Sequence, residues 1–237
     1  MAQGRKLVAG ARRVAVLTGA GISAESGLAT FRDSGGLWEN HRVEDVATPQ
    51  AFARDPVLVW EFYNARRRAG AQARPNPGHL ALAALEQRKE SVVIITQNVD
   101  GLHQKAGSTR VVELHGNIWR ARCARCGRAA ADLPVEVPFL SYCASCPGLL
   151  RPDIVWFGEA LAPRDLEAAA AALQDCGLFM VVGTSAQVQP AASFAFAAVG
   201  RGVGVIEVNK EETPLSSLVS VSLRGEAGEV LPALLFV

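Results

Sequence analysis

The sequence has almost no excess of charge of either sign, because 24 lysines and arginines stand against 23 acidic residues and leave a formal net charge of +1. A field this weak does not by itself support binding to nucleic acid or to a membrane surface. The chain also lacks any apolar run near the roughly 18 residues of a membrane-spanning helix. Only about a dozen residues precede the first apolar run, too few for a cleaved leader. We therefore expect a cytoplasmic protein with no nucleic-acid or membrane partner.

Cysteine is scarce, and four of the five cysteines form two C-x-x-C pairs separated by 16 residues. The pairs are Cys123 with Cys126 and Cys143 with Cys146. This spacing is typical of a Cys₄ zinc site in a reducing compartment. Four protein thiolates fill the coordination shell, so we expect one structural Zn²⁺ ion. Redox-active C-x-x-C pairs are the alternative, and the remaining Cys176 fits a small buried apolar side chain.

Short apolar runs alternate with helical patterns along most of the chain. The predicted strands are 13–18, 91–96, 110–115, 177–183 and 202–209, and the predicted helices are 77–89, 163–175, 190–199 and 226–235. Strands that are apolar throughout and alternate with helices are typical of a parallel sheet covered on both faces. The pattern predicts an α/β fold with a doubly wound parallel sheet.

Two segments interrupt that alternation. Residues 38–76 contain no clear strand but carry a helix, with Asp55 as its N-cap, Pro56 at its first position and Gly70 just beyond its end. Residues 119–150 hold the cysteine pairs and have too few apolar residues for a core of their own. We expect three units, namely a nucleotide-binding domain (1–37, 77–118 and 151–237), a helical insertion (38–76) and a zinc-binding module (119–150).

A glycine-rich stretch, "VAVLTGAGISAESG", follows the first predicted strand. Gly19, Gly21 and Ala24 fit the pattern G-x-G-x-x-A, in which glycines let the backbone approach a pyrophosphate at a helix N-terminus. A closely packed strand-to-helix turn would give the same letters. The acidic residue expected about 20 positions later at the end of a second strand is missing. The motif therefore favours a dinucleotide site, and a closely packed turn stays open as the alternative.

Polar residues also follow four other predicted strands, in "TQNVDGLH", "LHGN", "GTS" and "VN". In open α/β sheets the carboxyl ends of the strands form the binding crevice. Together these clusters offer donors and acceptors for the riboses, phosphates and bases of a dinucleotide.

The combined motifs resemble the sirtuins, the family of NAD-dependent protein lysine deacylases with a Rossmann-like fold. The matching stretches are "GAGISAESGLATFR", "TQNVDGLH", "ELHGN", the two C-x-x-C pairs, "RPDIVWFGE", "VVGTS" and "VIEVN". They occur in the family's order and extend over nearly the whole chain. The resemblance implies NAD as co-substrate, acyl-lysine proteins or peptides as partners, and nicotinamide, O-acyl-ADP-ribose and free lysine as products.

The resemblance also implies roles for individual residues in NAD binding. The phosphate-binding turn corresponds to Gly19, Ala20, Gly21, Ile22, Ser23 and Glu25, and the loop over the nicotinamide to Phe31 and Arg32. The ribose and nicotinamide pocket corresponds to Gln97, Asn98, Val99 and Asp100. The adenosine side corresponds to Gly183, Thr184, Ser185, Asn209 and Ala227.

His115 corresponds to the family's catalytic general base. In the family the acyl-lysine oxygen attacks the ribose as nicotinamide leaves, and the base then deprotonates a ribose hydroxyl. An imidazole with an ordinary pKa near 6.5 suits that step at neutral pH. For His103 we favour a structural hydrogen bond, and for His79 and His41 structural or surface roles.

We expect a strand over 155–159, "VWFGE". It resembles the edge on which the family adds the substrate peptide as a β-strand, with Val155, Phe157 and Gly158 as contacts. The aromatic residues Trp156 and Phe157 could instead belong to the core. We expect a monomer.

Tyr63 and Arg66 match the Y-x-x-R motif of the class III branch, whose members remove succinyl and malonyl groups. An arginine fork binds a carboxylate through two hydrogen bonds, and a tyrosine hydroxyl can add a third. The alternative is that Arg66 lies on a solvated helix end, as we expect for Arg67 and Arg68. We therefore expect removal of succinyl and malonyl groups, and weaker removal of acetyl.

Three other functions stay open at this point. A plain acetyl-lysine deacetylase would share every NAD and zinc motif. ADP-ribosyl transfer to protein would use the same NAD site with a different acceptor. A zinc-ribbon protein that binds nucleic acid through "RARCARCGR" is a remote alternative, because the net charge is close to zero.

Overall fold

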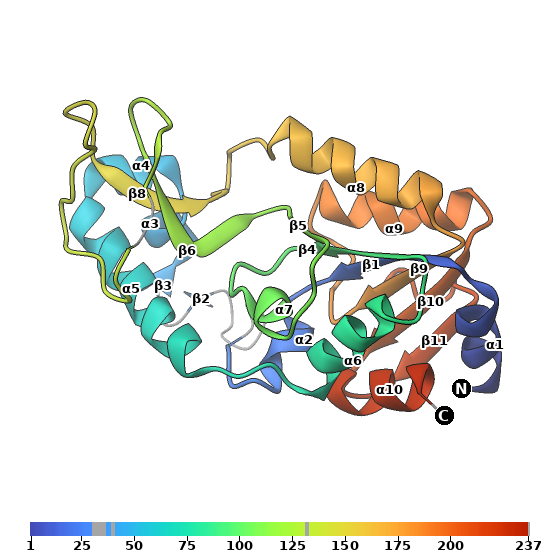
Figure 1. Ribbon diagram of the computed structural model, residues 1–237. Helices are drawn as coiled ribbons and strands as arrows, with labels where there is room; N and C mark the ends of the chain where they lie inside the picture. The colour runs from blue at the N-terminus through green and yellow to red at the C-terminus, as the bar shows by residue number, and fades with distance from the viewer. Residues whose placement is uncertain (30–36, 39–40, 131–132, 237) are drawn as a thin grey trace.

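The computed structural model describes residues 1–29, 37–38, 41–130 and 133–236, and for Leu37 and Trp38 it describes the backbone alone. Figure 1 shows two parts, a large sheet flanked by helices and a smaller part built from a few helices and short strands. In the ranges just given, no helix has the length and apolar character needed to cross a membrane.

The large sheet has six parallel strands in the order β11-β10-β9-β1-β4-β5. Its strands are β1 (Arg13–Thr18), β4 (Ser91–Thr96), β5 (Val111–Glu113), β9 (Leu178–Val182), β10 (Gly204–Asn209) and β11 (Val221–Arg224). The strands that follow β1 in the chain lie first on one side of it and then on the other. This is the doubly wound arrangement, whose ligand crevice lies where the strand order reverses. The predicted α/β Rossmann-like fold is confirmed.

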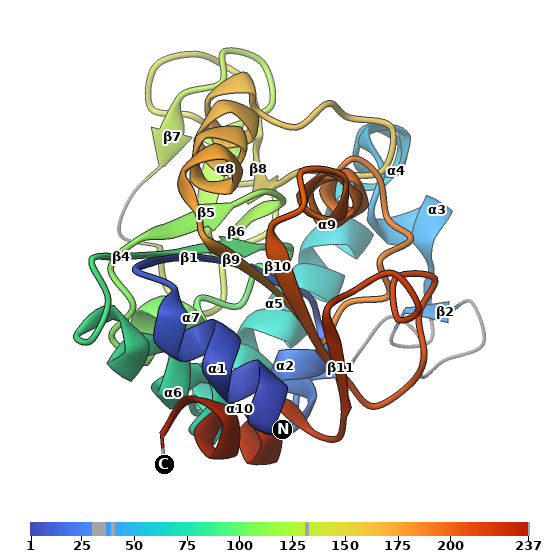
Figure 2. The ribbon, with the colours of Figure 1, turned by 90° about the vertical axis from the view of Figure 1, so that its right-hand side faces the viewer.

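Helices cover both faces of this sheet, as Figure 2 shows. One face packs against α1 (Ala2–Gly10), α6 (Pro77–Glu86) and α10 (Ala227–Leu235), and the other against α8 (Pro163–Asp175) and α9 (Ala191–Gly200). The side chains of β1 from Val14 to Thr18 are all buried. Burial on both faces explains why this strand is a continuous apolar run in the sequence. Two short helices, α2 (Gly21–Ala24) and α7 (Leu102–Lys105), follow strand ends.

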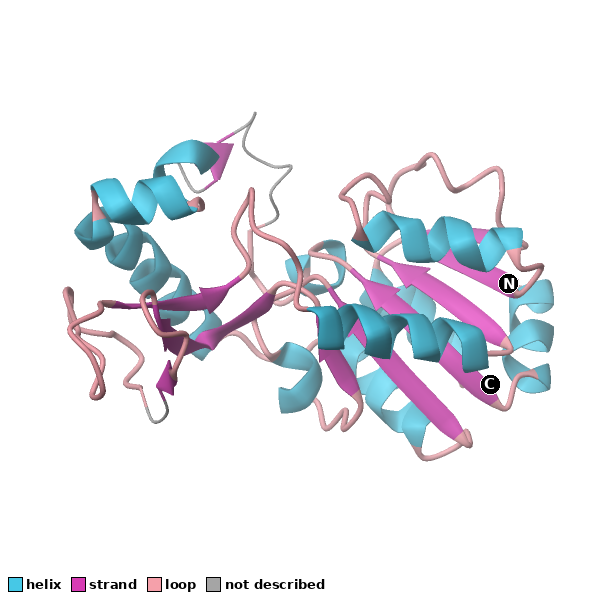
Figure 3. Ribbon diagram, turned by 90° about the horizontal axis from the view of Figure 1, so that it is seen from above, coloured by secondary structure: helices cyan, strands magenta, loops and turns pink. Residues whose placement is uncertain are grey.

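The smaller part has its own hydrophobic core, shared by the helical segment and the cysteine-containing segment. Its helices are α3 (Val43–Val46), α4 (Pro49–Arg54) and α5 (Pro56–Gln72). Its strands are β2 (Leu37–Trp38) paired with β3 (His41–Arg42), and a three-stranded antiparallel sheet of β6 (Gly116–Cys123), β7 (Ala129–Ala130) and β8 (Leu150–Ile154). Figure 3 shows this part set apart from the large sheet and its covering helices.

The helix predicted after Asp55 exists, but its predicted end is wrong. Asp55 caps α5 by accepting a 2.9 Å hydrogen bond from the Leu58 N–H, and Pro56 is the first helical residue. The helix continues past Gly70 to Gln72. A Cβ at Gly70 would lie 3.1 Å from the ring of Trp119. Gly70 is therefore a packing residue inside the helix and does not end it.

The predicted strand 155–159 is also wrong. The strand of this region, β8, ends at Ile154, and residues 157–158 form a turn in which Gly158 has a φ of +85°. A φ in this left-handed region favours glycine and interrupts an extended strand. The backbone N–H groups of Val155 and Phe157 donate to the carbonyl oxygens of His115 and Ala47.

Candidate active site and metal centre

The glycine-rich turn lies where the strand order reverses, between β1 and β9. The Gly21 N–H donates a 2.8 Å hydrogen bond to the Gly183 carbonyl, and the Gly19 N–H donates to the Val182 carbonyl at 3.0 Å. A Cβ at Gly19 would lie 2.7 Å from the Cβ of Thr184. No side chain fits between these two turns, so the glycines are required for their close approach. Close packing and an open cradle for phosphates are compatible here, because both leave backbone unobstructed by side chains.

The residues after β4 are joined to that turn by side-chain hydrogen bonds. Asn98 Nδ2 donates to the Gly19 carbonyl and to Ser23 Oγ, each at 3.1 Å. Ser23 Oγ in turn donates to Asp100 Oδ2 at 2.7 Å. Burial raises the pKa of the Asp100 carboxyl, against the hydrogen bonds from Leu102 and Ser23 and the positive charge of Arg66.

The adenosine-side residues of the resemblance are brought to the same edge of the sheet. Gln97 Nε2 donates to Thr184 Oγ1 at 2.9 Å, and Asn209 Nδ2 donates to the Thr184 carbonyl at 2.8 Å. Ser185 follows in the same turn, half-buried, and Ser185 Oγ accepts a 3.3 Å bond from the Gln187 N–H. The carboxyl ends of β1, β4, β9 and β10 thus meet at one place.

Three of the predicted NAD residues, Ile22, Val99 and Glu25, have contacts elsewhere in the structure. Ile22 is fully buried in the sheet core, and the Val99 carbonyl accepts from the Ile118 N–H at 2.9 Å. Glu25 Oε1 accepts a 2.8 Å bond from the Gly228 N–H in the first turn of α10, beside Ala227. Ala20 is exposed next to the turn. Phe31 and Arg32 lie outside the described residues.

His115 follows β5 and is half-buried. Its Nδ1 lies 3.0 Å from the carbonyl oxygen of Gln97. A carbonyl oxygen only accepts, so Nδ1 carries the proton and Nε2 keeps a lone pair. Burial lowers the pKa of His115 from its ordinary value, against the bond to Gln97. The ring is therefore neutral at pH 7, with Nε2 able to take a proton.

Two other histidines, His79 and His103, form a buried pair with ring centroids 4.9 Å apart. His103 Nε2 lies 3.0 Å from Thr18 Oγ1, which is the structural hydrogen bond expected for this residue. Burial lowers the pKa of His79 to about 4 and that of His103 to about 3, so both rings are neutral. His79 Nε2 is 3.5 Å from Ser23 Oγ, which places this pair directly behind the glycine-rich turn.

Asn76 was missed by the sequence reasoning. Its Oδ1 accepts from the N–H groups of Gly78 and His79 and so caps α6, and its Nδ2 donates to the Ile22 carbonyl at 2.6 Å. The letters "NPG" before a helical pattern are a capping signal that could have identified the first role. The second depends on the fold, because it joins two turns far apart in the chain.

Tyr63 lies on α5 in the core of the smaller part and is fully buried. Its hydroxyl accepts a 2.9 Å hydrogen bond from Nε1 of Trp156. Burial raises the pKa of Tyr63 to about 12, against the positive charge of Arg66 and the bond from Trp156. Arg66 is half-buried, with its guanidinium 5.7 Å from the ring centroid of Phe62. Trp156 is buried, which agrees with the alternative prediction that it belongs to the core. Phe157 is 50% exposed and does not.

Arg67 was expected at the solvated surface, and that expectation is wrong. It is 1% exposed, and its guanidinium donates to the carbonyl oxygens of Ile118, Pro134 and Val135. The guanidinium carbon of Arg67 also lies over the indole of Trp119, 5.2 Å from the ring centroid. Arg68 is exposed, as expected, with a surface ion pair to Glu136 at 3.2 Å.

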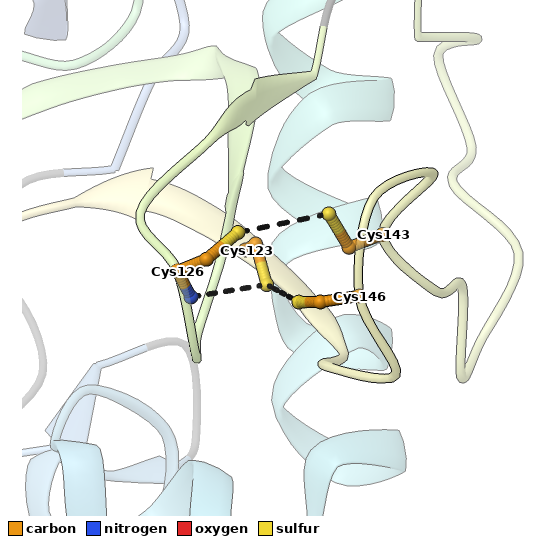
Figure 4. Close-up of side chains that lie close together, drawn as sticks. All are labelled: Cys123, Cys126, Cys143 and Cys146. Atoms are coloured by element: carbon orange, nitrogen blue, oxygen red, sulfur yellow. Dashed lines mark hydrogen bonds between the residues drawn. The ribbon is translucent and has the colours of Figure 1, made fainter.

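The four paired cysteines converge on one point, as Figure 4 shows. Their Sγ atoms all lie within 4.8 Å of one another. The Cys123–Cys146 sulfurs are 3.5 Å apart and the Cys126–Cys143 sulfurs 3.8 Å apart. A tetrahedron with Zn–S bonds of about 2.3 Å has edges of about 3.8 Å, so this set fits one zinc ion. All four positions are protein ligands, which makes the ion structural.

Comparison with known proteins agrees with this geometry. The model of the Sir2 family matches residues 19–190. NAD-dependent protein deacylase 2 of Pyrobaculum aerophilum is 53% identical over 230 residues, which are 96% of this chain and 92% of that protein. The mitochondrial NAD-dependent protein deacylase sirtuin-5 of Canis lupus familiaris is 44% identical, covering 98% and 84%. A solved complex of Sir2 with a p53 peptide and NAD⁺ is 34% identical, with a TM-score of 0.85, covering 96% and 94%.

Proposed function

Because this chain belongs to the Sir2 family, as an NAD-dependent protein deacylase of the class III sirtuins, we propose that it removes succinyl and malonyl groups from lysine in preference to acetyl. The enzyme transfers the acyl group from lysine to ADP-ribose and uses NAD as co-substrate. It also carries one structural zinc ion.

One chain of contacts carries the proposal, because it connects Tyr63 to the general base. The Tyr63 hydroxyl is bonded to Trp156 at 2.9 Å. The preceding residue, Val155, donates its N–H to the carbonyl of His115 at 2.9 Å. A single dipeptide thus lies between His115 and Tyr63. We propose that a lysine acyl group held beside His115 extends toward Tyr63.

The charges near Tyr63 suit an acidic acyl group. Arg66 follows Tyr63 by three positions, so the two share one face of α5. The positive charge of Arg66 lowers the pKa of both Tyr63 and Asp100, so its guanidinium lies close enough to act on both groups. Succinyl and malonyl groups end in a carboxylate, whereas acetyl ends in a methyl group. A guanidinium near a buried phenol hydroxyl complements such a carboxylate.

The size of the effect follows from the hydrogen bonds involved. A hydrogen bond to a charged group contributes about 1.5 to 3 kcal/mol. Each such bond changes a ratio of kcat/KM by about 10- to 150-fold, at 1.4 kcal/mol per factor of ten. An acetyl group leaves the site's donors without that partner, so we propose that acetyl-lysine reacts more slowly.

We propose that the remaining residues have the roles that the resemblance implies, which the observed contacts support. His115 acts as general base through Nε2, because its Nδ1 proton is held by the Gln97 carbonyl. The turn at Gly19 and Gly21 cradles the phosphates of NAD, and Asn98 and Asp100 bind its ribose and nicotinamide portion. Thr184 and Asn209 bind the adenosine portion.

We propose that an acyl-lysine peptide binds in extended form beside Val155, Phe157 and Gly158. Phe157 and Gly158 are exposed. The N–H groups of Val155 and Phe157 are already bonded within the chain, so backbone carbonyl oxygens and the Gly158 N–H supply the polar contacts. Such contacts read the peptide backbone more than its side chains. We further propose a cytoplasmic location, since zinc-binding thiols suit a reducing compartment. A monomer remains the simplest proposal for the oligomeric state.

The test is kcat/KM on succinyl-, malonyl- and acetyl-lysine versions of one peptide, for the wild type and for Arg66→Met. We expect Arg66→Met to lower kcat/KM on the two acidic substrates at least tenfold more than on the acetyl substrate. Arg68→Met is the matched control, since Arg68 lies on the same helix at the surface. Equal losses on all three substrates would contradict the proposal and leave a plain acetyl-lysine deacetylase.

A further inference from the structure

Trp156 controls which way the Tyr63 hydroxyl can point. The indole Nε1 lies 2.9 Å from the Tyr63 oxygen, and both side chains are buried. An indole N–H donates and never accepts, so the direction of this bond is fixed. Within the described part of the chain it is the one hydrogen bond at that oxygen. The phenol proton of Tyr63 therefore points away from the indole of Trp156.

Trp156 is itself held in place by contacts on several sides. The guanidinium of Arg151 stacks 3.4 Å from the indole ring centroid, and the ring of Phe52 lies 5.5 Å away. Both carboxylate oxygens of Glu159 bind Arg151, and one of them also accepts from the Trp156 backbone N–H at 2.9 Å. An indole fixed by its own backbone and by a stacked cation is a rigid donor.

We propose that Trp156 is a positioning residue for acyl-group choice, because its indole N–H occupies the Tyr63 oxygen and presents the phenol proton to the carboxylate of a succinyl or malonyl group. This inference rests on the proposed preference for acidic acyl groups. A carboxylate only accepts hydrogen bonds, so a phenol that turned a lone pair toward it would repel it. Trp156 removes that orientation before the substrate arrives, which lowers the cost of binding.

The direct test is Trp156→Phe, which keeps an aromatic ring and removes the N–H. The quantity measured is the ratio of kcat/KM on succinyl-lysine to kcat/KM on acetyl-lysine peptide. We expect the ratio to fall about 2- to 10-fold, the range that one neutral hydrogen bond produces. A general loss of packing would lower kcat/KM on both substrates by the same factor and leave their ratio unchanged.

Trp60 provides the matched control. It is 1% exposed in the same core, and its Nε1 donates to the Leu150 carbonyl at 2.9 Å. Trp60→Phe therefore removes a buried indole hydrogen bond of the same length that does not involve Tyr63. We expect it to lower stability and to leave the ratio unchanged. An equal fall of the ratio in Trp60→Phe would overturn the proposal.

A double-mutant cycle separates this role from others. In a Tyr63→Phe background there is no hydroxyl to orient, so Trp156→Phe should change the ratio no further. A further fall there, or an unchanged ratio in folded Trp156→Phe, would overturn the proposal. If the wild type shows no acidic preference, the proposed function fails as well. If Arg66→Met abolishes the preference but Trp156→Phe does not, this inference alone fails.

A second measurement needs no change at Trp156 and so does not depend on the folding of that variant. The indole N–H resonance of Trp156 can be identified as the one that moves in Tyr63→Phe. In the wild type we expect it to shift further on adding a succinyl-lysine peptide than on adding the acetyl-lysine peptide. Equal shifts with both peptides would overturn the proposal.

Discussion

The three consecutive arginines of α5 have three different environments, and Arg67→Met tests the least expected of them. Arg67 is 1% exposed and donates to three backbone carbonyl oxygens. Those carbonyls belong to β6 and to the segment before the second cysteine pair. Arg67 thus joins α5 to the zinc-binding part of the chain.

The magnitude follows from the balance of two effects. Each hydrogen bond from a charged donor contributes about 1.5 to 3 kcal/mol, and holding a guanidinium out of water costs several kcal/mol. Removing Arg67 also leaves three carbonyl oxygens without their partner. We expect Arg67→Met to lower the free energy of unfolding by about 3 kcal/mol. For a chain of this length that corresponds to a fall in Tm of about 6 to 12 °C.

The assay is thermal unfolding of zinc-loaded Arg67→Met beside Arg68→Met. The Arg68 side chain is 51% exposed and pairs with Glu136 at the surface. Exposed ion pairs contribute at most about 1 kcal/mol, so Arg68→Met should shift Tm by no more than about 4 °C. If the two variants unfolded at the same temperature, the reasoning from burial would be refuted.

Three further predictions concern the base, the zinc and a buried carboxylate. Burial lowers the pKa of His115 below its ordinary 6.5, so kcat/KM should fall only as pH drops below that value; a half-loss at pH 7 or above would contradict this. Cys126→Ser should lose the bound zinc, measured by metal analysis, and unfold at lower temperature; full stability without metal would contradict the structural role. Glu207 is fully buried, and although burial opposes it, hydrogen bonds from three hydroxyl groups and Arg224 lower its pKa below 4.5. Its ionised form therefore stabilises the fold above pH 4.5, and the contribution is lost as pH falls through the lower folded pKa. Glu207→Gln should cost about 2 kcal/mol at pH 7 and less at pH 4 in denaturant unfolding, and an equal cost at both would be evidence against this.

The strands β1, β4, β9 and β10 could be predicted because most of their side chains are buried. For β1 and β4 the predicted bounds, 13–18 and 91–96, match the structure. Because the carboxyl ends of parallel strands lie at the same edge of the sheet, the polar residues just after these strands were expected to lie close together there. Gly19, Asn98 and Thr184 do lie together at that edge. The strand β11 was missed because it is short and only half-buried, so it has no continuous apolar run.

The environment of α5 could be predicted only in part. Arg67 follows Tyr63 by four positions and Trp60 by seven, so all three share the buried face, and this periodicity was available in the sequence. What the sequence does not contain is the set of carbonyl oxygens that satisfies a buried guanidinium, because Ile118 and Val135 lie about 50 and 70 residues away. The contact of Tyr63 with Trp156 is hidden for the same reason, since 93 residues separate them.

The segment 155–159 shows a different limit of sequence-based prediction. The letters "VWFGE" have the apolar character of a strand, and local propensity favours one. In the structure the Val155 and Phe157 N–H groups are bonded to two different segments, and Gly158 turns the chain at positive φ. Tertiary contacts have overridden the local preference.

The acyl-group preference is the central claim, and a competition experiment measures it most directly. Succinyl-, malonyl- and acetyl-lysine forms of one peptide, mixed in equal amounts with NAD and the wild-type enzyme, compete in proportion to kcat/KM. Mass spectrometry of the O-acyl-ADP-ribose products gives the ratios at early times. We predict that succinyl and malonyl products exceed the acetyl product at least tenfold. An excess of the acetyl product, or equal amounts of all three, would contradict the account.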